Sequence, residues 1–267
     1  MNVSDLLGHF SLHELPFARA VSEAGLLRHR SFSEALTRLE LAIATKSPAL
    51  LLAEPGLGKS TLLGTLSDSL DRTRIRLVYT PLSSCGPFGL VGQLAVRYGL
   101  RSRRSAAQTA QAVLDELARS DKKEVLVLDE AHLLPRATLD ELRLLSNLDF
   151  DRLAPFALVL VGQPPLREAL ALPELASLAQ RLAIRASLAP LTEQETTDYL
   201  DRRLRAAGAR QTLFRPSASA RLFEKTRGVP RLINNLANAA LLAAAAVGKK
   251  HVDLQEVEDA SFDQDNA

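Results

Sequence analysis

A short segment at residues 50–62, LLAEPGLGKSTLL, places two glycines, a lysine and a hydroxyl residue between two apolar runs. Its centre almost fits the phosphate-loop pattern G-x-x-x-x-G-K-[ST], with Ala53 where the first glycine would stand. The backbone N–H groups of such a turn and the N-terminus of the following helix face one point, which favours an anion. We therefore predict a nucleotide phosphate site made of Glu54, Pro55, Gly56, Leu57, Gly58, Lys59, Ser60 and Thr61.

Two side chains of this segment have the chemistry that a bound nucleotide needs. Lys59 would reach the β- and γ-phosphates of ATP, and the Ser60 hydroxyl would hold Mg²⁺. Ala53 is small enough to replace glycine at the end of a strand. The motif alone leaves another interpretation open, a glycine-containing turn with a solvated lysine.

A second segment, EVLVLDEAHLL at residues 124–134, has the form of a buried parallel strand that ends in two carboxylates. Acids at the carboxyl end of such a strand face the ligand crevice. Asp129 could hold Mg²⁺ through water, and Glu130 could polarise a water for attack on the γ-phosphorus. The alternative is that the pair only caps the N-terminus of a helix. We interpret His132 as a histidine on a helix surface.

The elements that would position these side chains alternate along the chain. Strand patterns occur at ALLLAE, IRLVYT, EVLVLDE and FALVLVGQ, with helical patterns between them, and this alternation predicts a parallel sheet covered by helices. From residue 191 to residue 261 only helical patterns remain, and Thr192 with Glu195 forms a capping box at their start. We therefore predict an α/β domain at residues 1–190 and a helical domain at residues 191–267.

Composition narrows the class of protein. Hydrophobic residues make up 46% of the 267-residue chain, which is ordinary for a soluble globular protein. The alanine-rich run near residue 240 is too short to span a bilayer, and the N-terminus has no signal-peptide pattern, so we expect a cytoplasmic protein without a membrane contact. Cys85 is the only cysteine, which excludes an internal disulfide.

Positive charge is concentrated in one part of the chain. Residues 72–114 contain seven arginines and no lysine or acid, so this segment carries +7, and the rest of the chain carries −5 against a net charge of +2. Three of the arginines, Arg101, Arg103 and Arg104, crowd one predicted loop that has no aromatic residues to stack on bases. The loop suits phosphate contacts with duplex DNA, and the alternative is a solvated basic face.

Seven segments, LGKS, LVLDEAH, LLSNL, LVLVGQPPL, LAQRL, AAG…LF and GVPRLINN, occur in this order, and the set resembles the ExeA-like branch of the AAA+ ATPases. That branch includes secretion-pathway ATPases and ATP-dependent regulators of DNA transposition. The resemblance covers nearly the whole chain and implies an α/β fold, a parallel-sheet P-loop AAA+ core followed by a C-terminal helical lid. It also implies ATP hydrolysis with Mg²⁺ in a homo-oligomeric ring or filament.

The same resemblance implies roles for three further residues. Gln163 takes the place of the sensor that orients the attacking water, Arg181 that of the arginine finger supplied to a neighbouring subunit, and Arg231 that of the second sensor on the lid. Other roles remain open for these residues. Gln163 could cap a turn before Pro164 and Pro165, Arg185 could be the finger instead, and Arg231 could pair with Glu224.

Two functions follow from the resemblance, and the organisation of the chain is closest to that of the transposition regulators. The first function is an ATPase that polymerises on duplex DNA and recruits a transposase or a target-selection protein. The second is the cytoplasmic ATPase domain of a secretion-pathway protein that acts in envelope assembly.

Overall fold

The computed structural model describes residues 2–19, 21–81, 87–145 and 156–265. Cys85 and residues 146–148 of the LLSNL segment lie outside these ranges. The chain divides into two compact units, which we call the α/β unit (Ser31–Pro55 and Lys59–Leu188) and the helical unit (Met1–Arg30, Gly56–Gly58 and Ala189–Ala267).

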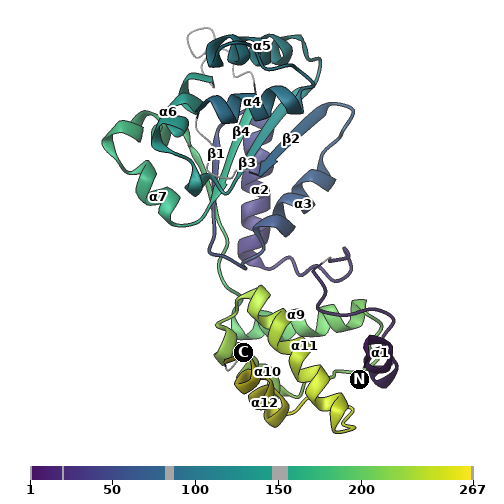
Figure 1. Ribbon diagram of the computed structural model, residues 1–267. Coiled ribbons are helices and arrows are strands. Elements are labelled where there is room, and N and C mark those ends of the chain that lie inside the picture. The colour runs from purple at the N-terminus through teal and green to yellow at the C-terminus, as the bar shows by residue number, and fades with distance from the viewer. Residues whose placement is uncertain (1, 20, 82–86, 146–155, 266–267) are drawn as a thin grey trace. The chain divides into compact units, whose positions relative to one another are not determined.

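A five-stranded parallel sheet in the order β2-β3-β4-β1-β5 forms the centre of the α/β unit (Figure 1). Its strands are β1 (Ala49–Leu52), β2 (Ile75–Pro81), β3 (Lys123–Asp129), β4 (Ala157–Gly162) and β5 (Ile184–Ser187). The helices of this unit are α2 (Arg30–Thr45), α3 (Lys59–Ser69), α4 (Pro87–Arg97), α5 (Ala106–Arg119), α6 (Arg136–Leu145), α7 (Pro165–Leu170) and α8 (Ala176–Arg181), with short 3-10 turns η1 (Ala131–Leu133) and η2 (Pro173–Leu175). The predicted parallel sheet with surrounding helices is confirmed.

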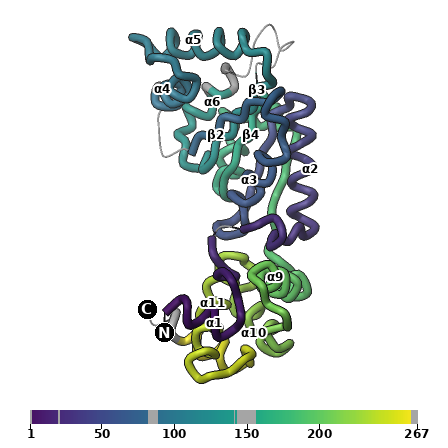
Figure 2. Tube along the Cα trace, turned by 90° about the vertical axis from the view of Figure 1, so that its right-hand side faces the viewer, coloured from purple at the N-terminus to yellow at the C-terminus, as the bar shows by residue number. Residues whose placement is uncertain are grey.

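The central strands are apolar because both of their faces are covered. Every residue of β1 and β4 is buried, and so is β3 after its first residue. Leu126 and Leu128 of β3 join a core cluster with side chains of α4, α5 and α6, while Val125 and Val127 are buried on the other face. Figure 2 shows α2 on the opposite side of the sheet from α4.

The fifth strand, β5, is absent from the sequence prediction. It has four residues, and exposed Arg185 and Ser187 alternate with buried Ala186, so no apolar run marks it. It forms because its backbone pairs with β1, with Leu50 beside Arg185. A short edge strand of this kind is determined by its neighbour in the sheet more than by its own residues.

The helical unit contains α1 (Val3–Phe10), α9 (Glu193–Ala206), α10 (Pro216–Thr226), α11 (Pro230–Ala246) and α12 (Leu254–Asp265). The predicted capping box is confirmed at the start of α9, where Thr192 Oγ1 accepts from the Glu195 N–H and the Glu195 carboxylate accepts from the Thr192 N–H. Residues 191–261 also contain one isolated parallel β-bridge, between Phe214 in the segment before α10 and Val252 in the segment before α12.

The structure differs from the predicted domain division at residues 1–30, which belong to the helical unit and not to the α/β unit. Buried Arg203 of α9 is the main anchor, because its Nε donates to the Pro16 carbonyl at 2.6 Å and its Nη2 to the Ala18 carbonyl at 2.7 Å. Phe17 packs edge-to-face on Phe214 with ring centroids 6.3 Å apart. These contacts join segments that are far apart in sequence, so local patterns do not reveal them.

We expect Arg203→Gln to detach the segment around Pro16 from α9. Two carbonyls lose a charged donor, which costs roughly 2–4 kcal/mol in the free energy of unfolding of the helical unit, and trypsin should cleave faster after the exposed Arg19. Arg202→Gln is the matched control, since Arg202 is the next residue of α9 and its Nε donates to the Ala24 carbonyl from an exposed position. Equal effects of the two changes on urea unfolding and proteolysis would contradict the anchor.

Candidate nucleotide-binding site

The register of the sheet brings three chain segments to one edge. Leu128 of β3 lies beside Leu160 of β4, which in turn lies beside Leu50 of β1. Because the strands are parallel, the residues that follow them leave the sheet on the same side. These residues are the phosphate loop after β1, the acids at the end of β3 and Gln163 after β4.

The phosphate loop has the backbone that its glycines predict. Gly56 has a φ of 85° and Gly58 a φ of 97°, a region that other residues avoid, and a Cβ added at Gly58 would meet no atom within 4 Å. Lys59 is the first residue of α3, and its Nζ donates to the carbonyls of Ala53 at 2.8 Å and Glu54 at 3.2 Å. The buried ammonium group is thus held by the loop that leads into the helix.

Ala53 fits its position without the conformational freedom of glycine. Its φ is not positive, its side chain is buried, and its N–H donates to the Gly162 carbonyl at 3.1 Å, which continues the pairing of β1 with β4. The other predicted loop residues surround this turn. Glu54, Pro55 and Ser60 are exposed, Thr61 is half-buried and Leu57 is buried.

Asp129 is a buried carboxylate with a donor on each oxygen. Its Oδ1 accepts from the Glu130 backbone N–H at 2.8 Å, and its Oδ2 accepts from the Tyr79 hydroxyl at 2.7 Å. Burial, followed by the bond to Asp129, raises the pKa of the Tyr79 phenol well above its ordinary value, so it remains a donor at neutral pH. Sequence reasoning missed Tyr79, and only the pairing of β2 with β3 reveals it.

Glu130 has a left-handed backbone with a φ of 55° at the N-cap position of η1, and its side chain makes no capping bond, so the Glu130 carboxylate does not act as a helix cap. Non-glycine residues in this conformation are uncommon and occur often at functional sites. The Gln163 Nε2 donates to Glu130 Oε2 at 3.3 Å, which also shows that Gln163 does more than cap the turn before Pro164.

His132 lies inside the site and not on a helix surface. Its side chain is 12% exposed, and its Nδ1 is 3.4 Å from Glu130 Oε2 without the geometry of a hydrogen bond. The expectation of a surface histidine is therefore wrong. It fails because residues 131–133 form a 3-10 turn that contacts β4, where the backbone of His132 approaches Gly162, and not a regular exposed helix.

Two arginines compete for the role of a group supplied to a neighbouring subunit. Arg185 lies on β5, and its guanidinium donates to carbonyls of α8 and its C-terminus, Ala179 at 3.3 Å and Leu182 at 3.4 Å. Arg181 is the last residue of α8 and is half-buried. The bonds of Arg185 show that it stabilises its own chain.

Arg231 lies in the first turn of α11, in the helical unit with Gly56–Gly58. Its N–H donates to the Gly56 carbonyl at 3.2 Å, and a Cβ at Gly56 would come within 2.9 Å of the Arg231 Cβ. Glu224 does not pair with Arg231, because it binds Arg221 at 2.7 Å.

The arginine-rich loop connects α4 to α5. Arg101, Arg103 and Arg104 are exposed, and within the described parts of the chain no ion pair joins them to an acid. Two hydrogen bonds hold the loop. Before it, the Tyr98 hydroxyl donates to the buried carboxylate of Glu124 at 3.1 Å, and within it the Arg103 N–H donates to Thr109 Oγ1 at 2.9 Å.

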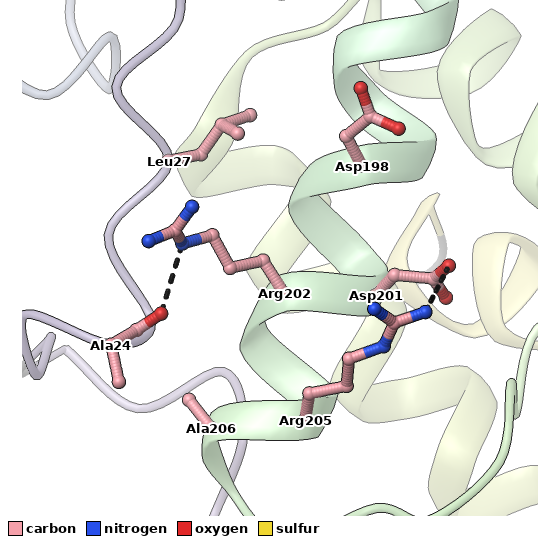
Figure 3. A pocket seen from close by; sticks show the side chains of 7 residues that line it. All are labelled: Ala24, Leu27, Asp198, Asp201, Arg202, Arg205 and Ala206. Carbon is pink, nitrogen blue, oxygen red and sulfur yellow. Dashed lines mark hydrogen bonds and ion pairs between the residues drawn. The ribbon is translucent and has the colours of Figure 1, made fainter.

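The helical unit has a pocket of about 630 Å³ of its own, shown in Figure 3. Two acids and two arginines of α9 line it with three apolar residues of α9 and the N-terminal segment: Ala24, Leu27, Asp198, Asp201, Arg202, Arg205 and Ala206. Arg202 is fixed at one side by the Ala24 carbonyl and Arg205 pairs with Asp201 at 4.0 Å. These lining residues are separate from the predicted nucleotide site.

Comparison with known proteins finds a family match that lies within the range of the α/β unit. Residues 43–170 match the family model described as AAA domain. The chain is 34% identical over 250 residues to general secretion pathway protein A of Aeromonas hydrophila, an alignment that covers 91% of this chain and 45% of that protein. The chain therefore spans less than half the length of this relative.

Solved structures share the fold at lower identity. Cdc6p from Pyrobaculum aerophilum superposes with a TM-score of 0.76 at 22% identity, over 93% of this chain and 70% of that one. Drosophila ORC bound to DNA superposes with a TM-score of 0.64 at 18% sequence identity, and the match covers 97% of this chain and 66% of that one. The RuvB Holliday junction branch migration motor of Thermotoga maritima superposes with a TM-score of 0.58 at 21% sequence identity, and the match covers 91% of this chain and 72% of that one. The chain thus has a P-loop AAA+ fold. In the described ranges, no helix has the length and apolar character needed to cross a membrane.

The geometry of Ala53 leads to a prediction. Ala53→Gly should leave the affinity for an ATP analogue within about twofold, since the position needs neither a positive φ nor more space, while stability falls by about 1 kcal/mol from the added chain entropy. Gly58→Ala should weaken binding, because its φ of 97° is strained for alanine. Titration of both variants with a fluorescent ATP analogue tests this, and tighter binding by Ala53→Gly would show that alanine impairs the loop.

Proposed function

We propose that this chain is an ATPase module whose catalytic centre is the edge where β1, β3 and β4 end. One observation carries the proposal: the carboxylate of Glu130, a residue with a left-handed backbone, accepts a hydrogen bond from the Gln163 side-chain amide. The phosphate loop with its buried lysine follows the strand next to β4. A carboxylate and an amide aimed at one position can orient a water and take up its proton.

The residues present fit a magnesium nucleotide. The phosphate loop leaves open space at Gly58, and the α3 N-terminus and Lys59 supply positive charge for phosphate oxygens. Ser60 and Asp129 are the groups that would hold Mg²⁺, which neutralises charge on the phosphates when it is bound. Asp129 stays aimed at this edge because both its oxygens accept hydrogen bonds.

Arg181 and Arg231 complete the proposal. Arg231, whose backbone meets Gly56, is the candidate for contact with the γ-phosphate. Arg181 takes the place of the finger given to a neighbouring copy in a ring or filament, as the resemblance implies, and Arg185, whose guanidinium donates to carbonyls of its own chain, is the alternative. Hydrolysis would then depend on assembly of the homo-oligomer.

Of the two biological settings, we favour the secretion pathway. The general secretion pathway protein A of Aeromonas hydrophila is similar over almost the whole of this chain, which supports a role as the ATPase part of an envelope-assembly system. We place the site in the cytoplasm, where ATP is available. The alignment covers 45% of that relative, and the proposal concerns only the part that corresponds to this chain.

A DNA-dependent role is the second candidate, and the loop of Arg101, Arg103 and Arg104 favours it. Three exposed guanidinium groups without acidic partners among the described residues form a site for a polyanion, and subunits assembled on a duplex would repeat it. A regulator of transposition that recruits a transposase or target-selection protein would use such a surface. The loop supports DNA binding only, and the partner stays a hypothesis.

Two substitutions should separate ATP binding from hydrolysis. Lys59→Ala removes the charge that meets the phosphates and should reduce affinity for ATP by at least about 100-fold, since a charged hydrogen bond and the loop contacts of the ammonium are removed. Glu130→Gln keeps the shape of the side chain and should bind ATP normally while turnover falls by about 100-fold or more through loss of the base. Equilibrium binding and phosphate release on both variants test this, and normal turnover by Glu130→Gln would exclude Glu130 as the base.

The DNA role has a separate test. Replacing Arg101, Arg103 and Arg104 together with alanine should weaken duplex binding equally for all sequences and flatten the salt dependence by about one counterion for each phosphate that the protein no longer neutralises. The double change Arg72→Ala and Arg74→Ala is the control, because these exposed arginines already pair with Asp68 and Asp71. If neither the unaltered protein nor its variants bind duplex DNA with an ATP analogue present, the secretion role alone remains.

A further inference from the structure

Tyr79 is an aromatic side chain that donates to an acid of the proposed site. Its hydroxyl is 2.7 Å from Asp129 Oδ2, while the Glu130 N–H occupies Oδ1 at 2.8 Å. A carboxylate oxygen has two acceptor positions, so each oxygen of Asp129 has one position taken and one left. The side chain of Asp129 is therefore fixed in orientation and still able to accept further donors.

The pairing of β2 with β3 explains how this contact arises. Tyr79 lies beside Val127, and Pro81 lies beside Asp129, so Tyr79 is two residues short of the acid along the strand. Residues two apart on a strand share a face, and the long phenol reaches along that face to the carboxylate. Leucine and valine have no hydroxyl to donate, and phenylalanine would fill the same space without the bond.

The two partners of this bond differ in burial. Tyr79 as a residue is 39% exposed and its hydroxyl bond to Asp129 is part-buried, whereas Asp129 is 5% exposed and depends on protein donors. The torsion that orients an aspartate carboxylate is broad, with no sharply staggered preference. Without Tyr79, only the backbone N–H of Glu130 would restrain the rotation of the Asp129 carboxylate.

We propose that Tyr79 is a positioning residue for Asp129, and that it keeps the free acceptor positions of the carboxylate aimed at the hydrated divalent cation of a bound nucleotide. This inference rests on the proposed function, since it assumes that a magnesium nucleotide occupies the site. Partners that orient a group near a metal typically contribute 10–100-fold to metal affinity. The contribution of Tyr79 should therefore appear in the metal dependence of nucleotide binding.

The test compares Tyr79→Phe with Tyr98→Phe. The control removes the same kind of bond in the same unit, because the Tyr98 hydroxyl donates to buried Glu124 at 3.1 Å, at the opposite end of β3 from Asp129. A fluorescent ATP analogue is titrated at several Mg²⁺ concentrations and in EDTA. Tyr79→Phe should need about 10-fold more Mg²⁺ for half-maximal tightening, with unchanged affinity in EDTA. Tyr98→Phe should match the unaltered protein in both measurements.

A second measurement does not depend on turnover. Mn²⁺ replaces Mg²⁺, and electron paramagnetic resonance counts the ion bound in the presence of ADP, where Tyr79→Phe should retain less Mn²⁺ at equal free concentration. Equal Mg²⁺ dependence in Tyr79→Phe and the unaltered protein would overturn the positioning role, as would a loss of affinity of equal size with and without metal. If the unaltered protein binds the analogue with no dependence on Mg²⁺, the proposed magnesium site is wrong, and so is the role of Tyr79 that rests on it.

Discussion

The parallel alignment of β1, β3 and β4 is the constraint on which the site depends. A parallel sheet sends every strand's carboxyl end to one edge, so three segments separated by up to about 110 residues of sequence meet there without any direct link between them. β4 has a central part in this arrangement, because it lies between the strand before the phosphate loop and the strand that carries the acids. Gln163, at the end of β4, is consequently next to Glu130.

Local patterns in the sequence are enough to predict the features that local chemistry determines. The glycine turn, the buried strands of continuous valine and leucine, and the capping box of Thr192 with Glu195 all appear as expected. The features that such patterns miss depend on contacts between distant residues. β5 exists through its pairing with β1, and Tyr79 becomes part of the site only through the register of β2 on β3.

His132 and the N-terminal segment illustrate the same limit in another way. A histidine after two acids looks like part of an exposed helix, and it is buried because the chain tightens into a 3-10 turn against β4. The first 30 residues precede an α/β pattern and so seem to belong to it, yet their backbone carbonyls are bound by Arg203, almost 190 residues later in the chain. No window of local sequence contains both partners of either contact.

The course of the chain has a consequence for its synthesis. The helical unit is built from both ends of the described sequence, and the α/β unit lies between them as a nearly continuous insertion. A ribosome would therefore release α1 and the segment near Phe17 long before α9, α11 and the Val252 bridge that they need have been made. The helical unit therefore cannot fold in order from its N-terminus during synthesis. The α/β unit can fold first, while the apolar N-terminal segment remains exposed to solvent.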